Sequence, residues 1–352
     1  MARDRARETA GGPRVAGIEL AAGLVRAVVA RAEGGRLRVV GRGETALAAD
    51  AIAGGLVVEP GAVTSAVATA LAAAERGVPS DRTIIAIDGD DVRTYHVRTP
   101  FDREESATPI VRAEADRAVR EARDEAARVA QTAVADDPAL RGVATARLTD
   151  AVAALVLDGR DLDSIEGYHG RALEVHTDVA VAPLVLSGAA LATVAPRRRP
   201  TAVPGIYALA RLVAASGIAD AGVVRVGADV TALAIVRERR VVGTRVFGLG
   251  RDAFTAREDT RDEDARVWAE IVALPLNDNA QPPERWLFVG VPEALLALPN
   301  ALAKIVGEAR GGAARIGPLT PSVTSRVFSD VPLNAEDLIA AGAAALAAEV
   351  YT

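Results

Sequence analysis

Three carboxylates near the ends of apolar runs are the side chains best placed for acid–base chemistry. Asp88 follows the apolar run at 83–87, and Asp178 and Asp229 lie beside two further runs. A carboxylate held in a cleft can act as the base of a phosphoryl-transfer or hydrolytic enzyme. Each of the three is more simply interpreted as a turn or strand-end residue. An enzyme is therefore the less favoured class.

Composition excludes several other kinds of chemistry. The chain has no cysteine, which rules out disulfides, thiolate metal sites and cysteine nucleophiles. Lys304 is the only lysine, so no phosphate-loop or Schiff-base lysine can lie elsewhere. The histidines His96, His169 and His176 follow no metal-ligand spacing and are expected to be ordinary surface or strand residues.

The chain as a whole is typical of a globular protein with more than one folding unit. It has 352 residues, half of them hydrophobic, and a net charge of −6 with the two signs interspersed. No basic stripe indicates a nucleic-acid surface. Residues 1–13 lack the apolar core of a secretory signal, and no unbroken apolar stretch could span a membrane. We expect a cytoplasmic protein without nucleic-acid partners.

Two similar groups of strands would position the acidic residues. Apolar runs at 15–20, 24–31 and 36–40 predict a three-stranded meander, followed by a helix at 60–76 and a strand at 83–87. Runs at 222–226, 230–236 and 239–247 predict a second meander. RVVG occurs at 38–41 and again at 240–243, about two hundred residues apart. That separation indicates duplicated domains, because solenoid repeats have much shorter periods.

The segment between the two copies predicts a small α+β module. A charged helix at 109–134 follows a strand at 92–97 and precedes strands at 143–157 and 172–181. The helix has a thin apolar stripe that includes Val119, Ala126, Val129 and Ala130, and its charged face is expected to be solvated. The alternative is that this face is an interaction surface.

The last hundred residues predict helices around one more strand. We expect a charged helix at 262–274, a polar loop at 277–284, a strand at 286–289 and helices at 292–309. Asn334, with Asp337 three residues later, predicts a capped closing helix that ends near residue 350. This helix is mostly alanine and lacks the aromatic and basic residues of an interfacial anchor. It is therefore expected to be a core helix, with no direct membrane anchor.

This order of elements resembles that of the actin-like ATPases, and within them the FtsA family of bacterial cell-division proteins, with the PilM family of type IV pilus assembly as second choice. The residues that carry the resemblance are GIEL at 17–20 with VRAVV at 25–29, IEGYHG at 165–170 leading to LEVHTDV at 173–179, and FGLGRD at 247–252. The pattern covers nearly the whole chain.

The resemblance implies an α/β fold of the actin-like, ribonuclease H-like kind, with two duplicated lobes, an inserted α+β subdomain and a reduced second-lobe subdomain. We expect a disordered arm at 1–13, the first lobe at 14–89, the inserted subdomain at 90–183 and the second lobe at 184–352. The closing helix at 334–350 could pack on either lobe.

The resemblance also implies a nucleotide pocket, which is degenerate here. In the first loop Glu19 stands where the family has an aspartate, and Ala21, Ala22 and Gly23 replace residues that include hydroxyl donors. In the second loop the usual aspartate is Arg225, and Gly227, Asp229 and Thr231 are the other matching positions. Gly290 stands at the adenosine loop. Mg-ATP or ADP binding and no nucleotide at all both remain open.

Arg225 is the substitution with the clearest physical consequence. Its guanidinium could pair with a phosphate, or with Glu19 or Asp229 across an empty cleft. We favour the second arrangement, since it leaves no unpaired charge in a partly buried site. The sequence therefore predicts a pseudo-ATPase, without catalytic or metal-ligating residues, whose cleft is closed by an arginine–carboxylate pair.

The implied function is a scaffold or adaptor. The first hypothesis is an FtsA-like scaffold in cell division, with protein partners from the division machinery or a second copy of itself. The alternatives are a PilM-like adaptor that binds a membrane-protein peptide in pilus or secretion assembly, and an actin-fold ATPase or kinase. In the first two a partner would recruit the protein to the inner face of the membrane.

Overall fold

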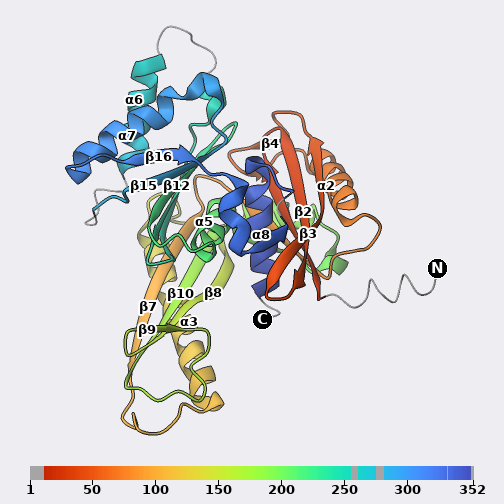
Figure 1. Cartoon of the computed structure of the whole chain (residues 1–352). Coiled ribbons are helices and arrows are strands. Elements are labelled where there is room, and N and C mark those ends of the chain that lie inside the picture. The colour runs from red at the N-terminus through yellow and green to blue at the C-terminus, as the bar shows by residue number, and fades with distance from the viewer. Residues whose placement is uncertain (1–11, 255–260, 275–280, 331, 350–352) are drawn as a thin grey trace.

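A six-stranded sheet forms the first lobe. The computed structural model describes residues 12–254, 261–274, 281–330 and 332–349. Most of the expected N-terminal arm and the first half of the loop at 277–284 therefore lie outside the described residues. The sheet has the order β11-β6-β1-β2-β3-β17 (Figure 1). Its strands are β1 (Arg14–Ala21), β2 (Leu24–Glu33), β3 (Arg36–Ala46), β6 (Arg82–Ile87), β11 (Thr201–Pro204) and β17 (Phe328–Asp330).

The second lobe repeats this topology. Its sheet has the order β14-β13-β12-β15-β16. The strands are β12 (Ala221–Val226), β13 (Thr231–Arg237), β14 (Arg240–Phe247), β15 (Arg285–Val289) and β16 (Arg315–Pro318). In both sheets an antiparallel meander is joined by two parallel strands beside its first strand. The duplication inferred from the repeated RVVG segment is confirmed.

Helices cover the outer face of each sheet at corresponding places in the two copies. α2 (Pro60–Glu75) lies between β3 and β6, and α6 (Arg261–Ala273) lies between β14 and β15. α2 and α4 (Leu184–Ala192) share a core with the first sheet, whereas α6 and α7 (Ala297–Arg310) share one with the second. α4 was not predicted, nor were the short strands β4 (Ile52–Ala53) and β5 (Leu56–Val57).

Two helices pack against each other between the lobes. α5 (Gly205–Ala215) packs on β13 and β14, and α8 (Leu338–Ala348) packs on β1, β2 and β6 (Figure 1). Their side chains join both inner sheet faces in the largest apolar core. The predicted closing helix is confirmed, together with its capping box, in which Asn334 N–H donates to Asp337 Oδ2 at 2.6 Å. The helix packs on the first sheet and, through α5, faces the second.

Gly17 of the first-loop motif is required by this helix. A Cβ atom at Gly17 would lie 1.9 Å from the carbonyl oxygen of Ala340 and 2.4 Å from the backbone nitrogen of Ala344. No side chain fits such a gap. β1 and α8 therefore meet backbone to backbone, and the small residues of α8 allow this close approach.

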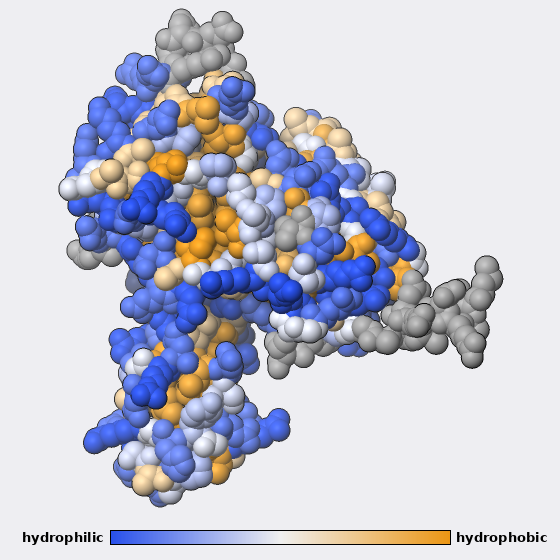
Figure 2. All heavy atoms as spheres, in the orientation of Figure 1, coloured by the Kyte–Doolittle hydropathy of each residue, from blue (hydrophilic) through white to orange (hydrophobic). Residues whose placement is uncertain are grey.

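The inserted segment forms a separate four-stranded sheet with one helix. The sheet order is β7-β10-β8-β9. The elements are β7 (Arg93–Asp102), α3 (Arg112–Asp136), β8 (Thr145–Leu157), β9 (Arg160–Leu162) and β10 (Ala172–Pro183). They project below the two lobes in Figure 1. Figure 2 shows an apolar strip along this module, between hydrophilic flanks.

The apolar stripe of α3 differs in part from the expected one. The side chains buried against the sheet are Ala118, Ala122, Ala126 and Ala130, which recur at every fourth residue. Val129 is exposed. Alanine lets the helix approach the sheet closely. A stripe of alanines is also harder to recognise in the sequence than a stripe of larger apolar residues.

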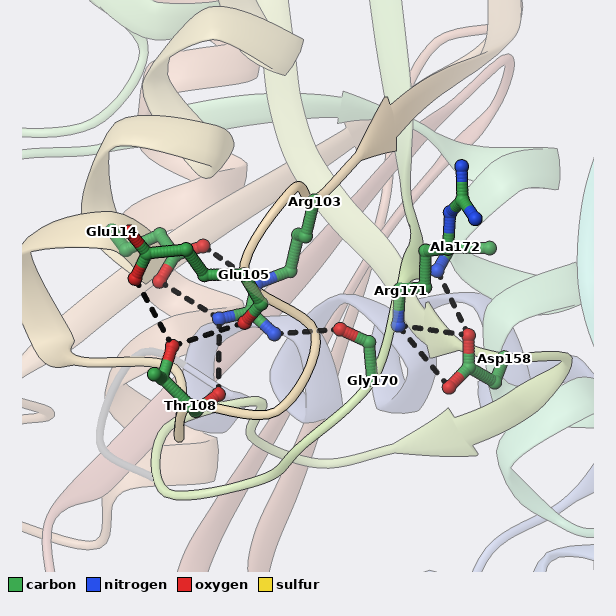
Figure 3. A network of polar contacts seen from close by, with 8 residues as sticks. All are labelled: Arg103, Glu105, Thr108, Glu114, Asp158, Gly170, Arg171 and Ala172. Atoms are coloured by element: carbon green, nitrogen blue, oxygen red, sulfur yellow. Dashed lines mark hydrogen bonds and ion pairs between the residues drawn. The ribbon is translucent and has the colours of Figure 1, made fainter.

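The far end of the module is held together by Arg103, which is buried. Its guanidinium donates to Glu114 Oε1 at 2.6 Å, to the carbonyl oxygen of Gly170 at 2.6 Å and to that of Thr108 at 3.3 Å (Figure 3). One side chain thus fixes two loops to the first turn of α3. Asp158 performs a similar task nearby, by accepting hydrogen bonds from the backbone of Arg171 and Ala172.

Within the described ranges, none of the helices combines the length and hydrophobicity that crossing a membrane requires.

Candidate functional site

The two hairpin turns and the loop after β15 surround one cavity between the lobes. Its volume is about 430 Å³. Seven of the nine residues predicted for the nucleotide pocket line it: Glu19, Ala21, Ala22, Gly23, Arg225, Gly227 and Gly290. Gly23 and Gly290 have φ values of 77° and 80°, a backbone conformation that favours glycine. The repeat therefore brings equivalent turns of the two lobes together.

Arg225 lies at the bottom of this cavity and joins the two lobes. It extends from β12 and donates a hydrogen bond to Glu19 Oε1 on β1. Its Nη1 also lies 3.7 Å from Asp88 Oδ2, at the end of β6. The three side chains are between 2% and 8% exposed. The pairing of Arg225 with Glu19, expected from the sequence, is confirmed.

The electrostatics of this cluster favour a charged arginine. Burial alone would lower the pKa of Arg225, but Glu19 and Asp88 outweigh it and raise that pKa. The pKa of Asp88 is raised by burial, although Arg225 and the backbone N–H groups of Ile206 and Gly205 oppose the shift. Asp88 accepts from Ile206 N–H at 3.0 Å, so it also caps α5.

Arg26 is a functional-site residue that the sequence analysis missed. It stands directly opposite Glu19 in the β1–β2 register, and its Nη1 lies 3.5 Å from Glu19 Oε2. It also pairs with Glu44 of β3 and with Glu336, just before α8. The tight turn at Ala22 and Gly23 fixes this register, so counting back from the turn could have identified the pair.

Asp229 and Thr231 have other roles. Asp229 Oδ2 accepts from the backbone N–H of Gly54 at 2.7 Å and so links the second-lobe turn to the first lobe. The Thr231 hydroxyl donates to the carbonyl oxygen of Leu249 at 2.6 Å and accepts from Trp268 Nε1 at 3.0 Å. Neither residue lines the cavity.

The cavity does not fit Mg²⁺ with a nucleotide triphosphate. The residues that line it include no serine or threonine, so hydroxyl donors for phosphates are missing. The guanidinium of Arg225 lies between the carboxylates of Glu19 and Asp88 and is paired with both. Their oxygens are therefore not free to coordinate a divalent cation. No cluster of three potential ligands occurs anywhere in the part of the chain that the structure describes.

The three aspartates considered as bases are all engaged. Asp88 interacts with Arg225 and α5, and Asp229 accepts from Gly54. Asp178, fully buried, accepts from His96 Nδ1 at 2.7 Å and from Tyr207 Oη at 2.9 Å. Asp178 thus belongs to a different polar network from the other two. The geometry does not assemble a catalytic site from them.

Comparison with known proteins gives a result at the level of structure alone. No family model and no curated protein matches the sequence. Among solved structures, the chain is similar to one described as a PilM–PilN type IV pilus biogenesis complex, with 19% identity, 94% of this chain and 97% of the other covered, and a TM-score of 0.54.

Two further structures are more distant. One is a Bacteroides thetaiotaomicron protein described as having an actin-like ATPase fold and unknown function (10% identity, 88% and 92% coverage, TM-score 0.45). The other is the cytoplasmic domain of EpsL, an inner membrane component of the type II secretion system of Vibrio cholerae (10% identity, 94% coverage of both chains, TM-score 0.42). With its duplicated sheets and the two helices packed between them, the chain has the actin-like ATPase fold.

Proposed function

We propose that this protein is an actin-fold adaptor that no longer binds nucleotide, and that it binds the cytoplasmic segment of a membrane protein during pilus or secretion assembly. The observation that carries the proposal is the buried cluster of Glu19, Arg225 and Asp88. An arginine from one lobe neutralises the carboxylates of the other, at the place where the fold would otherwise hold metal and phosphate. The protein then keeps a fixed arrangement of lobes without a ligand.

The similarity to the PilM–PilN complex supports the adaptor class, because that structure contains a protein bound to a partner. An apolar surface patch at the junction of the inserted module and the first lobe gives further support. Val143, Leu184 and Val185 are between 42% and 65% exposed, and Leu184 N–H donates to the carbonyl oxygen of Ala144 at 2.7 Å. Exposed apolar patches commonly mark protein-binding surfaces.

Calorimetric titration with Mg-ATP and Mg-ADP tests the loss of nucleotide binding. We expect no detectable heat of binding with the wild-type protein, because Arg225 fills the metal position. The Arg225→Asp variant would place three carboxylates together, and we expect it to bind Mn²⁺ and to gain affinity for Mg-ATP. Arg225→Leu, which removes the charge but adds no ligand, is the matched control. Micromolar binding by the wild-type protein would refute the proposal.

Site-specific photocrosslinking at Val185 in the native cells tests the adaptor role. We expect an inner-membrane protein to be crosslinked through its cytoplasmic segment, and the Leu184→Glu variant to reduce the yield. The exposed Val242, on the second lobe, provides a control position.

An FtsA-like scaffold in cell division is the second candidate, favoured by the place of the inserted module between β6 and β11 in the chain order. Crosslinking to division proteins instead of pilus or secretion components would select it.

A further inference from the structure

Two histidines touch each other on the face of the inserted sheet that is turned away from α3. His96 comes from β7 and His176 from β10, and their ring centroids are 5.2 Å apart. In the strand register His96 is directly opposite Asp178, two residues beyond His176. Residues two apart on a strand share one face, so all three side chains point the same way. Their spacing in the sequence predicts only ordinary surface or strand residues.

Together with Glu174 the three side chains form a row of contacts that ends in a carboxylate on each side. Asp178 Oδ1 lies 2.7 Å from His96 Nδ1, and His96 Nε2 lies 3.0 Å from His176 Nδ1. His176 Nε2 in turn lies 3.4 Å from Glu174 Oε2. Asp178 is fully buried and His176 is 7% exposed. The row therefore runs from the protein interior to Glu174.

Counting protons shows what is unusual about this row. Each of its three contacts needs one hydrogen between the two heavy atoms. Two neutral imidazoles bring two hydrogens, and ionised carboxylates bring none. With both histidines neutral, Asp178 accepts from His96, His96 accepts from His176, and the bare Nε2 of His176 faces Glu174. The row thus has room for one additional proton, at His176 Nε2.

Charged groups from every neighbouring element surround this position. Glu174 also accepts from Arg98 of β7, and Arg240 of β14 lies close enough to act on His176. Arg240 itself pairs with Asp161 and Glu238.

On the interior side, Asp178 accepts from Tyr207 of α5 and lies 3.8 Å from Arg211, which pairs with Glu349 after α8.

A cavity gives solvent access to the outer end of the row. Its volume is about 500 Å³, and it is lined by Arg98, Glu174, His176, Arg239 and Arg240, among others. It lies between the inserted sheet and the β13–β14 turn of the second lobe. A proton that enters here reaches His176 at the contact between these two parts of the molecule.

We propose that the His96–His176 pair binds a single proton and that this proton loosens the contact between the inserted module and the β13–β14 hairpin. The added charge would stand beside Arg240 on an imidazole ring that is largely buried, so the docked arrangement opposes it. Acidification therefore favours the arrangement in which the hairpin has moved away. The hydrogen bond gained toward Glu174 only partly offsets this effect.

The direction of the shift in the His176 pKa agrees with this proposal. Burial, Arg240 and His96 lower the pKa of His176, and Glu174 opposes them. A histidine whose pKa is lowered in the docked state stabilises that state above its ordinary value near pH 6.5. The stabilisation is lost as the pH falls.

Nuclear magnetic resonance of the histidine rings tests the single-proton site, since the chain has only three histidines. We expect His96 and His176 to shift together between pH 8 and pH 5, in one step that corresponds to one proton. The exposed His169 serves as the internal reference. In the Arg240→Gln variant the common step should move to higher pH. Two independent protonation steps would overturn the proposal.

Hydrogen–deuterium exchange tests the coupling to the hairpin. After correction for the intrinsic pH dependence, exchange in β14 should be faster at pH 5.5 than at pH 7.5, by up to about tenfold for each unit by which the pKa is lowered. The His176→Gln variant should abolish this difference, whereas His169→Gln should retain it. If His176→Gln does not fold, His96→Gln replaces it. An acid-dependent change that persists without the titrating pair would contradict the mechanism.

Discussion

Single residues decide the chemistry of the cleft between the lobes. Arg225 forms an internal ion pair with Glu19 across the cleft, and Asp88 contributes to it while capping α5. Breaking a buried pair by removing one partner is strongly destabilising, because a charge is then left uncompensated. In the wild-type protein the guanidinium of Arg225 is the cation that compensates the buried carboxylates of Glu19 and Asp88.

The raised pKa of Asp88 gives a prediction on pH dependence. A carboxyl whose pKa is raised in the folded state contributes stability that is present below its unfolded value, near 3.8, and is lost as the pH rises through the folded value. We expect the Asp88→Asn variant to gain stability relative to the wild-type protein as the pH increases over this range, by about 1.4 kcal/mol for each unit of elevation.

Urea unfolding at several pH values would measure the difference. The exposed Asp50 provides the control, since Asp50→Asn should show no such trend. A stability difference that decreases with rising pH would show that the ion pair with Arg225 outweighs burial.

At the scale of elements, the closing helix α8 packs directly against the backbone of the first sheet, with no side chain between them. Gly17 of β1 lies against the backbone of α8, and Gly342 of α8 lies against that of α5, where an added Cβ would be 2.5 Å from the carbonyl oxygen of Ala208. Close-packed interiors do not adapt to such additions without a shift of the whole element. The position of α8 matters for the cleft, because Glu336 and Ile339 line its cavity.

We therefore expect the Gly17→Ala variant to be destabilised by about 2–3 kcal/mol or more, since α8 would have to move. Gly243→Ala is the matched control. It is also a glycine in a meander strand, but an added Cβ would meet no atom within 4 Å. Denaturant unfolding of both variants checks the prediction, and equal effects would show that the β1–α8 contact adapts.

At the scale of the whole molecule, polar contacts across the cleft and the shared apolar core hold the lobes together. The pair of Arg225 with Glu19 is buried, and the hydrogen bond from Gly54 to Asp229 is exposed. α5 and α8 connect both sheets beneath them.

Amide exchange offers a test of this arrangement. We expect the exchange rates at 52–57 and 227–230 to be unchanged by millimolar Mg-ATP, because the pair of Arg225 and Glu19 already joins the two lobes. The Asp229→Ala variant should raise the exchange rate of the Gly54 amide, which loses its acceptor. Asp50→Ala is the control. Nucleotide-dependent protection in the wild-type protein would indicate that the lobes still respond to ligand.

Local sequence determined most of the secondary structure. Both meanders, α2, the inserted strand–helix–strand order and the capped closing helix follow from periodicity and turn residues within short windows. The short strands β9, β11, β16 and β17 could not be predicted in the same way. They contain three or four residues each and become strands only because another strand lies beside them.

Tertiary structure decided the arrangement of the site. The sequence offered two possible carboxylate partners for Arg225, Glu19 and Asp229. Only the folded chain brings Glu19, 206 residues away, within hydrogen-bonding distance of Arg225 and directs Asp229 to the backbone of Gly54. The same holds for α8, whose apolar surface is suited to either lobe, and for the row of His96, His176 and Asp178. Such contacts depend on how separate elements pack, and no local pattern encodes the distance between them.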